Sequence, residues 1–229
     1  MERIILIETS TALCSTALAE EGTIVAYRES SAPKAHASLT AVFIKEMLEE
    51  RGLNISDCDA VCVSKGPGSY TGLRVGVSTA KGLCFGSGKP LIAVGTLDTL
   101  VAQAVTDIPG EYRFIIPMID ARRMEVYAAV YETATARQIT ETAPVIVDGN
   151  SFAEYLEQGP VLFIGDGAGK CADVIRHPNA DFCQCHPKAS SMLEPACKAY
   201  KEKRFEDVAY FEPFYLKEFV ATVSKKKLF

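Results

Sequence analysis

The sequence predicts an α/β fold built from two related units, each with a mixed β-sheet and helices on the faces of that sheet. Two patterns lead to this prediction. Three consecutive strands are followed by alternating helices and strands, and a second set of strands begins near Arg113. The length of 229 residues fits one large domain or two small ones. We therefore expect a first domain over residues 1–106 and a second, more irregular domain over residues 107–229.

The first domain is predicted to open with a β-meander. Buried strands are expected over Arg3–Glu8, Cys14–Ala19 and Ile24–Glu29, because each is a short run rich in apolar residues. The hydroxyl-rich turn Thr9-Ser10-Thr11 follows the first strand, and the tight turn Glu21-Gly22-Thr23 precedes the third. Three strands joined by such short turns are typical of antiparallel neighbours in one sheet.

The rest of the first domain alternates between helix and strand. A helix is expected over Ala37–Arg51, where apolar residues recur at helical spacing and Gly52 marks the end. The elements after it are, in order, a strand over Ala60–Ser64, a helix over Tyr70–Phe85, a strand over Leu91–Val94 and a helix over Thr96–Val105.

The second domain repeats this organisation less regularly after a boundary at Asp107–Glu111. The sequence leaves the positions of two segments open. The last helix and the C-terminal segment could pack on the second domain or back on the first one. The predicted strands are Arg113–Met118, Glu125–Tyr131, Val145–Val147 and Val161–Ile164, and the predicted helices are Ser151–Glu157 and Ala189–Lys203.

The charge balance argues against a protein that binds nucleic acid by itself. The chain has 24 Lys and Arg against 29 Asp and Glu, a formal net charge of −5, whereas phosphate neutralisation normally requires a basic excess. The N-terminus lacks a signal peptide pattern, and no apolar run approaches the ~20 residues of a membrane span. We expect a cytoplasmic protein whose eight cysteines are reduced thiols.

The segment Lys65–Gly76 is the most specific motif. Its glycines and a proline lie between a buried strand and a helix, where they can adopt positive φ and direct N–H groups at a ligand. The segment lacks the Gly-Lys-Ser/Thr of a Walker A loop and does not fit G-x-G-x-x-G. The pattern favours a tight connection capped by Ser69 or Thr71 over a phosphate-binding loop.

The helix after this loop carries Gly72, Gly76 and Ala80 four residues apart on one face, with Arg74 and Lys81 as its only charges. Small residues at this spacing let another backbone approach closely. Glycine inside a helix costs about 0.5–1 kcal/mol relative to alanine, so a packing contact must offset it. That contact lies either inside the same domain or on another subunit.

Three further clusters give weaker signals. The run Asp120–Tyr127 is most simply a charged hairpin tip, and Gly165–Lys170 is a short glycine cluster after a strand. Cys183, Cys185 and His186 lie close in sequence, but cysteines one residue apart are poorly spaced for zinc. No arrangement of a catalytic nucleophile is found.

The glycine loop, together with Ile7–Thr11, Asp120–Tyr127 and Glu212–Lys217, resembles the TsaB (YeaZ) family over almost the whole chain. The resemblance implies an actin/hexokinase-like (ASKHA) fold of two related domains. It also implies a non-catalytic subunit that binds and activates TsaD, the paralogue that transfers a threonylcarbamoyl group to the adenosine next to the tRNA anticodon. A TsaE-like ATPase would complete the assembly, and tRNA would be reached through the complex.

The same resemblance implies no catalytic and no metal-binding residues here. TsaD-like members present two histidines four residues apart, whereas this chain has His36 and Thr40. Glu8 stands where TsaB relatives mostly have Asp. We expect no cofactor in the isolated chain, with ATP and metal on partner subunits. The residues that could be a remnant of a phosphate site are Glu8, Ser10, Thr11, Gly66, Gly68 and Ser69.

The expected partner interface lies on the helices 37–51 and 70–85, which would contact a TsaD-like subunit or, in its absence, a second copy of this chain. The residues predicted for it are Leu39, Phe43, Gly72, Gly76 and Ala80. The alternative function is a stand-alone ASKHA-type phosphotransferase or ATPase that uses Glu8, the loop Gly66–Gly72 and Gly165-Asp166-Gly167. A metallopeptidase is less favoured.

Overall fold

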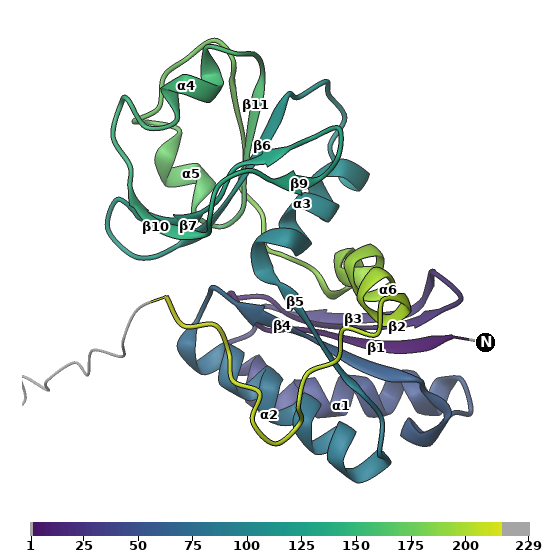
Figure 1. Cartoon of the computed structure of the whole chain (residues 1–229). Helices are drawn as coiled ribbons and strands as arrows, with labels where there is room; N and C mark the ends of the chain where they lie inside the picture. The colour runs from purple at the N-terminus through teal and green to yellow at the C-terminus, as the bar shows by residue number, and fades with distance from the viewer. Residues whose placement is uncertain (1, 217–229) are drawn as a thin grey trace, which may run out of the picture.

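Two β-sheets organise the chain, as shown in Figure 1 for a computed structural model that describes residues 2–216. The first sheet has five strands in the order β3-β2-β1-β4-β5, and the second has seven, with the path β10-β7-β6-β11-β12 and β8 and β9 beside it. Helices lie against both sheets. This arrangement confirms the predicted α/β fold.

The first sheet contains both antiparallel and parallel pairs. Strands β1 (Arg3–Glu8), β2 (Cys14–Glu20) and β3 (Thr23–Ser30) form the expected antiparallel meander. Strands β4 (Ala60–Gly66) and β5 (Leu91–Gly95) continue the sheet in parallel with β1. The sheet is therefore mixed. Short turns join the three antiparallel strands, whereas longer connections that contain a helix lead to the parallel strands β4 and β5.

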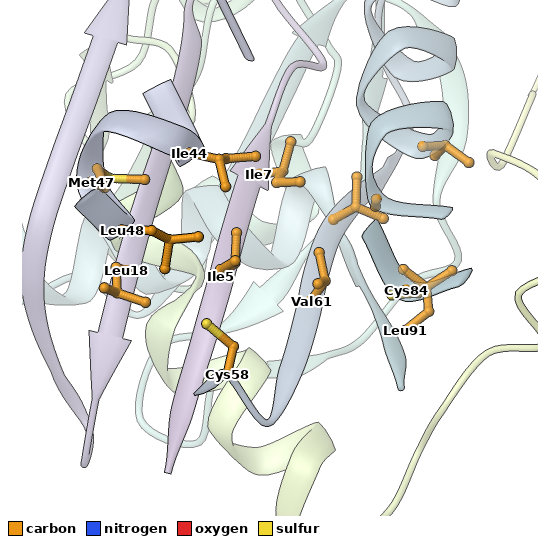
Figure 2. Close-up of a cluster of buried hydrophobic side chains, with 13 residues drawn as sticks. Ile5, Ile7, Leu18, Ile44, Met47, Leu48, Cys58, Val61, Cys84 and Leu91 are labelled. Carbon is orange, nitrogen blue, oxygen red and sulfur yellow. The ribbon is translucent and has the colours of Figure 1, made fainter. Parts of the chain in front are cut away.

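Both faces of the first sheet are covered. Helices α1 (Ala35–Glu50) and α2 (Tyr70–Ser87) lie on one face, and α6 (Leu193–Lys201) lies on the other (Figure 1). Alternate residues of β1 point to opposite faces, so Ile5 and Ile7 pack toward α1 and α2, as in Figure 2. Ile4 and Leu6 pack in the cluster that contains α6. Burial on both faces explains the continuous apolar run of this strand.

The second sheet is less regular. Its parallel core is β6 (Phe114–Asp120), β11 (Val161–Ile164) and β12 (Ala180–Cys183). The predicted strand 125–131 is two strands, because β7 (Glu125–Ala128) and β8 (Tyr131–Glu132) pair with different parts of β6. The remaining strands are β9 (Arg137–Gln138) and β10 (Ala143–Ile146), and the short helices are α4 (Ala153–Leu156) and α5 (Ala168–Cys171).

Two connections join the sheets. Helix α3 (Thr96–Asp107) follows β5 and packs against β6 and β11 through the cluster around Leu100. Residues 184–188 lead back from β12 to the 3₁₀-helix η2 (Ala189–Met192) and α6. The predicted helix 189–203 is therefore a 3₁₀ turn followed by a shorter α-helix.

The segment after α6 runs along the first sheet (Figure 1). The Glu206 amide donates to the Leu91 carbonyl at 2.8 Å, and the Phe214 amide donates to the Lys65 carbonyl at 2.7 Å. No helix within residues 2–216 is long and apolar enough to cross a lipid bilayer.

Candidate functional site

A cleft of about 960 Å³ separates the two sheets at the carboxyl ends of β1 and β6. The first domain contributes the turn after β1 and the glycine loop before α2, including Ser10, Thr11 and Ser69. The second domain contributes the charged hairpin that follows β6, including Asp120 and Arg122. Ligands of open α/β sheets commonly bind at this end of the strands.

Glu8, the last residue of β1, lies beneath the first-domain wall and has no exposed surface. Its Oε1 accepts hydrogen bonds from the Ser10 amide at 2.7 Å and from the Ser64 hydroxyl at 2.9 Å. Burial raises the pKa of this carboxyl from 4.5 to about 7, although the hydrogen bonds from Ser10 and Ser64 lower it. Glu8 therefore carries a proton at a pH where an exposed glutamate is ionised.

Glu8 and the turn after it contain several buried polar atoms without a partner among the described residues. They are Glu8 Oε2 and the hydroxyl oxygens of Thr9, Ser10 and Thr11. The Thr11 carbonyl accepts a hydrogen bond from Nε2 of His36 at 2.8 Å, and the Thr40 hydroxyl donates to the His36 carbonyl at 2.6 Å. His36 is thus held against the turn by backbone contacts.

The glycine loop packs tightly on this turn. The Ser69 amide donates to the Ser10 carbonyl at 2.6 Å, and a Cβ on Gly68 would overlap the same carbonyl oxygen. Ser69 also caps α2, since its hydroxyl accepts from the Gly72 amide at 3.2 Å. Gly66 has φ of 106°, and a Cβ there would meet the Phe214 carbonyl at 2.9 Å. The residues predicted as a remnant of a phosphate site therefore lie together in the fold. The glycines among them allow the loop and the turn to pack closely.

The second-domain wall is held by its own polar contacts. Lys170 pairs with Asp120 and donates to the carbonyls of Arg123 and Glu125, both at 2.7 Å. Asp166 accepts a hydrogen bond from the Asp120 amide at 2.9 Å, and burial raises the pKa of its carboxyl. The run 120–127 is therefore a charged hairpin tip whose ends are fixed, as the sequence favours.

The glycine cluster 165–169 likewise uses its amides internally. The amides of Gly165, Gly167 and Gly169 donate to the Cys183 carbonyl at 3.1 Å, the Met118 carbonyl at 3.0 Å and Gln184 Oε1 at 2.6 Å. These amides are not directed at the cleft.

The stand-alone phosphotransferase considered from the sequence would need a site for a magnesium–nucleotide pair, and the residues named above are engaged within the protein. The carboxylate that would face the metal is enclosed, and the named amides of both glycine segments are bonded within the protein. Within residues 2–216, no three His, Cys, Asp or Glu side chains are grouped to hold a metal ion.

The structure corrects the prediction that Gly72, Gly76 and Ala80 contact a partner. A Cβ on Gly72 would overlap the Thr9 carbonyl oxygen, and one on Gly76 would overlap the Thr9 hydroxyl. Ala80 has no exposed surface and belongs to the core under α2. The small residues let α2 lie close to the end of β1, so their contact is inside the domain.

The opposite face of α2 is exposed and lacks charge over its C-terminal half. Ser78, Gly82, Phe85 and Gly86 are exposed, and they share one helix face. The Phe85 side chain is 88% exposed, and a Cβ on Gly82 would have no neighbour within 4 Å. Helix surfaces that face water normally carry charged residues.

The neighbouring helix α1 also exposes apolar residues on its N-terminal half. Val42 is 43% exposed, and the predicted interface residues Leu39 and Phe43 are half-buried. We call the exposed residues Ala41, Val42, Ser78, Gly82, Phe85 and Gly86, with Leu39 and Phe43 beside them, the α1/α2 outer face.

The C-terminal segment adds residues that the sequence does not identify as part of the site. The Tyr215 ring lies 5.0 Å from the Tyr70 ring, and its hydroxyl accepts from Arg74 Nε at 3.2 Å. Lys81 donates to the carbonyls of Ala209 and Phe211, both at 3.0 Å. Both charges of α2 therefore hold this segment. The sequence offers one signal for this role: α2 has only two charged residues, and both of them bind the C-terminal segment.

Comparisons with known proteins agree on one group of relatives. The family model described as "TsaD: tRNA N6-adenosine threonylcarbamoyltransferase" matches residues 28–226. The chain is 32% identical over 225 residues to the tRNA threonylcarbamoyladenosine biosynthesis protein TsaB of Escherichia coli (strain K12), with 96% of each chain covered. It is 31% identical over 222 residues to the protein of the same name from Bacillus subtilis (strain 168), with 93% of each chain covered.

The solved structure "YeaZ from Pseudomonas aeruginosa" superposes with a TM-score of 0.81 at 26% identity, over 94% of this chain and 100% of that chain. This likeness confirms that the chain has the fold of that YeaZ structure over nearly its whole length. A tRNA N6-adenosine threonylcarbamoyltransferase of Clostridium botulinum matches at 28% identity over 127 residues, which is 50% of this chain and 37% of that protein.

Proposed function

Because this chain belongs to the TsaB family, we propose that it is the non-catalytic partner subunit of a TsaD-type transferase in tRNA threonylcarbamoyladenosine biosynthesis. In this role it binds and activates the transferase, which moves the threonylcarbamoyl group to the adenosine next to the anticodon. A TsaE-type ATPase completes the assembly. The net charge of −5 supports a role in which the complex, and not this chain alone, binds tRNA.

The proposal rests mainly on one observation, which is that the outer face of α2 has no charged residue over its C-terminal half. A phenylalanine that is 88% exposed loses the free energy it would gain from burial, about 1.5–3 kcal/mol. Covering the α1/α2 outer face with a partner would recover that free energy. We place the interface there, with Leu39 and Phe43 retained from the sequence prediction and with Phe85 in place of the buried Gly72, Gly76 and Ala80. In the absence of the transferase, a second copy of this chain would cover the same face.

The alternative of a stand-alone phosphotransferase receives less support from the site. Such an enzyme needs an ionised, accessible carboxylate and free amides for phosphate oxygens. Glu8 is enclosed, and the Ser69 amide is bonded to the Ser10 carbonyl at 2.6 Å. We therefore propose that the isolated chain binds no nucleotide, and that ATP and metal belong to the partner subunits. A metallopeptidase has no supporting side-chain cluster within the described residues.

The proposal is tested by reconstitution. The chain is combined with TsaD and TsaE from the same species, the adenylate-forming enzyme, threonine, bicarbonate, ATP and unmodified tRNA, and the modified adenosine is quantified. We expect modification only when the chain is present. The variant Phe85→Asp should fold normally and weaken binding to TsaD by about 30-fold or more, because a charge would occupy an apolar interface.

Ile146→Asp is the matched control, since Ile146 is 77% exposed but lies in β10 of the second sheet. It should leave complex formation unchanged in size-exclusion chromatography. Full binding by Phe85→Asp would refute the proposed interface alone. Equal modification without the chain would refute the proposed function.

A further inference from the structure

A turn with two consecutive arginines lies in the second-domain wall of the cleft. Residues 121–124, which we call the β6–β7 turn, connect β6 to β7, and Arg122 and Arg123 are exposed there and line the cleft. Neither guanidinium has a hydrogen-bond or ion-pair partner within residues 2–216. Among the other arginines in this part of the chain, only Arg137 of β9 shares this property. The two charges of the turn are therefore available to a ligand.

The backbone of this turn has a conformation that arginine rarely adopts. Arg122 has φ of 70° and Arg123 has φ of 47°. This region favours glycine and asparagine, because the Cβ of other residues crowds the backbone. Backbone strain of this kind occurs most often at functional sites, where the surrounding contacts enforce it. The chain therefore has arginine at two positions that the local conformation disfavours.

Contacts from both sides hold the β6–β7 turn in place. The Arg122 amide donates to Asp120 Oδ1 at 2.8 Å. Lys170 donates to the carbonyls of Arg123 and Glu125, both at 2.7 Å. The backbone that carries the two arginines is thus fixed before any ligand arrives, which lowers the entropy cost of binding.

The carboxylates beside the turn do not neutralise the two arginines. Asp120 pairs with Lys170, and Asp166 accepts the Asp120 amide at 2.9 Å. Glu125 is half-buried at the start of β7. The charge that the β6–β7 turn offers to the cleft is therefore positive, although the chain as a whole is acidic.

The opposite wall of the cleft offers groups of two other kinds. Ser10 and Thr11 line the cleft, are 0% and 4% exposed, and have hydroxyl groups with no partner in the described part of the chain. Buried polar groups are normally hydrogen-bonded, so these hydroxyls favour a polar ligand in the cleft. Tyr70 and Tyr215 line the same wall and are half-buried. Aromatic rings of this kind stack with unpaired nucleic-acid bases.

We propose that the β6–β7 turn binds the phosphate backbone of a single-stranded RNA segment at the cleft. Guanidinium groups bind phosphate oxygens through paired hydrogen bonds, and two arginines on a fixed turn can contact neighbouring phosphates. Bases of the same segment would lie toward Tyr70 and Tyr215 on the other wall. The inference rests on the proposed function, since tRNA is the RNA that the complex would bring to this chain.

The exposure of Arg122 and Arg123 favours an RNA strand over a small anion or a protein. Pockets for small ligands bury most of the ligand surface, whereas both arginines are exposed. The core of a protein interface is apolar, and exposed apolar residues lie on the α1/α2 outer face instead. Two arginines on a chain of net charge −5 are too few to hold RNA alone, so the contact acts within the complex.

Salt-dependent binding of tRNA tests the inference. The sample is the complex of this chain with TsaD and TsaE from the same species, and the probe is fluorescently labelled, unmodified tRNA. Arg122→Gln/Arg123→Gln should weaken binding by about 25-fold at 0.1 M salt. It should also lower the slope of log affinity against log salt by about 1.4, because each single-strand phosphate contact contributes about 0.7. Both positions are exposed, so the thermal unfolding midpoint should stay unchanged.

Arg137→Gln/Arg176→Gln is the matched control. It removes the same charge from exposed residues that also follow β6 in the chain but do not line the cleft. This variant should change the affinity for tRNA by less than about twofold, because phosphates of the bound segment lie elsewhere. An equal loss of affinity in both double variants would show a general charge effect and overturn the inference.

Other outcomes would also overturn it. Wild-type affinity and slope in Arg122→Gln/Arg123→Gln would show that the turn does not contact RNA. Loss of complex formation by this variant in size-exclusion chromatography without tRNA would assign the turn to a protein contact. Displacement of tRNA by inorganic phosphate at matched ionic strength would assign it to the free anion.

Failure of this inference can be told apart from failure of the proposed function. If the wild-type chain is required for modification but the arginine variant binds tRNA normally, only the role of the turn is refuted. If modification is equal without the chain, the proposed function itself is refuted.

Discussion

Replacing Glu8 by glutamine should make the protein more stable at pH 8 and remove a pH dependence that the buried carboxyl creates. The pKa of Glu8 is raised from 4.5 to about 7 by burial, so the folded state holds this proton over an interval in which the unfolded chain has released it. The neutral Glu8 carboxyl makes its full contribution to the free energy of unfolding below pH 4.5. This contribution is lost as the pH rises through 7. At about 1.4 kcal/mol per pH unit, the loss is about 3 kcal/mol.

The Glu8→Gln variant should keep both hydrogen bonds to its side-chain oxygen, from Ser10 at 2.7 Å and from Ser64 at 2.9 Å. An amide does not ionise, so the stability of the variant relative to the wild type should rise by about 3 kcal/mol between pH 4.5 and pH 8. Urea denaturation at a series of pH values measures this difference. A difference that stays constant within about 0.5 kcal/mol over the whole range would refute the reasoning.

Glu20→Gln is the control of opposite sign. A hydrogen bond from Arg3 and the nearby charge of Arg51 lower the pKa of Glu20, so its ionised form stabilises the fold. This variant should be less stable than the wild type at neutral pH. The difference should shrink as the pH falls from 4.5 through the lower pKa of the folded state, because below that pKa both states carry the proton.

The remaining predictions concern α2 and the segment that it holds. Gly72→Ala should destabilise the chain by about 1–3 kcal/mol, because its Cβ would overlap a backbone carbonyl, whereas Gly82→Ala on the open face should stabilise it by about 0.5–1 kcal/mol. Equal thermal unfolding midpoints for these two variants would contradict the assignment of the helix faces. Tyr215→Ala should remove the ring contact with Tyr70 and the hydrogen bond from Arg74, and so accelerate proteolytic cleavage within 206–216 without lowering the unfolding midpoint of the first domain. Unchanged cleavage would show that other contacts hold this segment.

The local elements could be predicted from the sequence because they depend on spacing within each segment. Continuous apolar runs identify β1 and β4, and apolar residues at helical spacing identify α1. Short elements were harder to predict. Strand β12, with four residues, was missed, since its burial depends on pairing with β11 and not on a pattern of its own.

The candidate site could be predicted only as a set of segments. The sequence indicates that Glu8, the turn after it and the glycine loop belong together, and it shows that Gly72 and Gly76 need a close neighbour. It does not contain the identity of that neighbour, because a four-residue spacing is the same whether the contact is a partner helix or the end of β1. The three-dimensional structure identifies Thr9 as the neighbour.

The two α/β units, the order of their main elements and the family resemblance can be predicted from the amino-acid sequence alone, because they follow from local apolar patterns and short motifs. The buried face of α2, the enclosure of Glu8 and the position of residues 206–216 along the first sheet are known only from the folded chain. These features arise from contacts between segments that are far apart in the chain. Packing and burial at such contacts depend on both segments together, so neither segment alone predicts them.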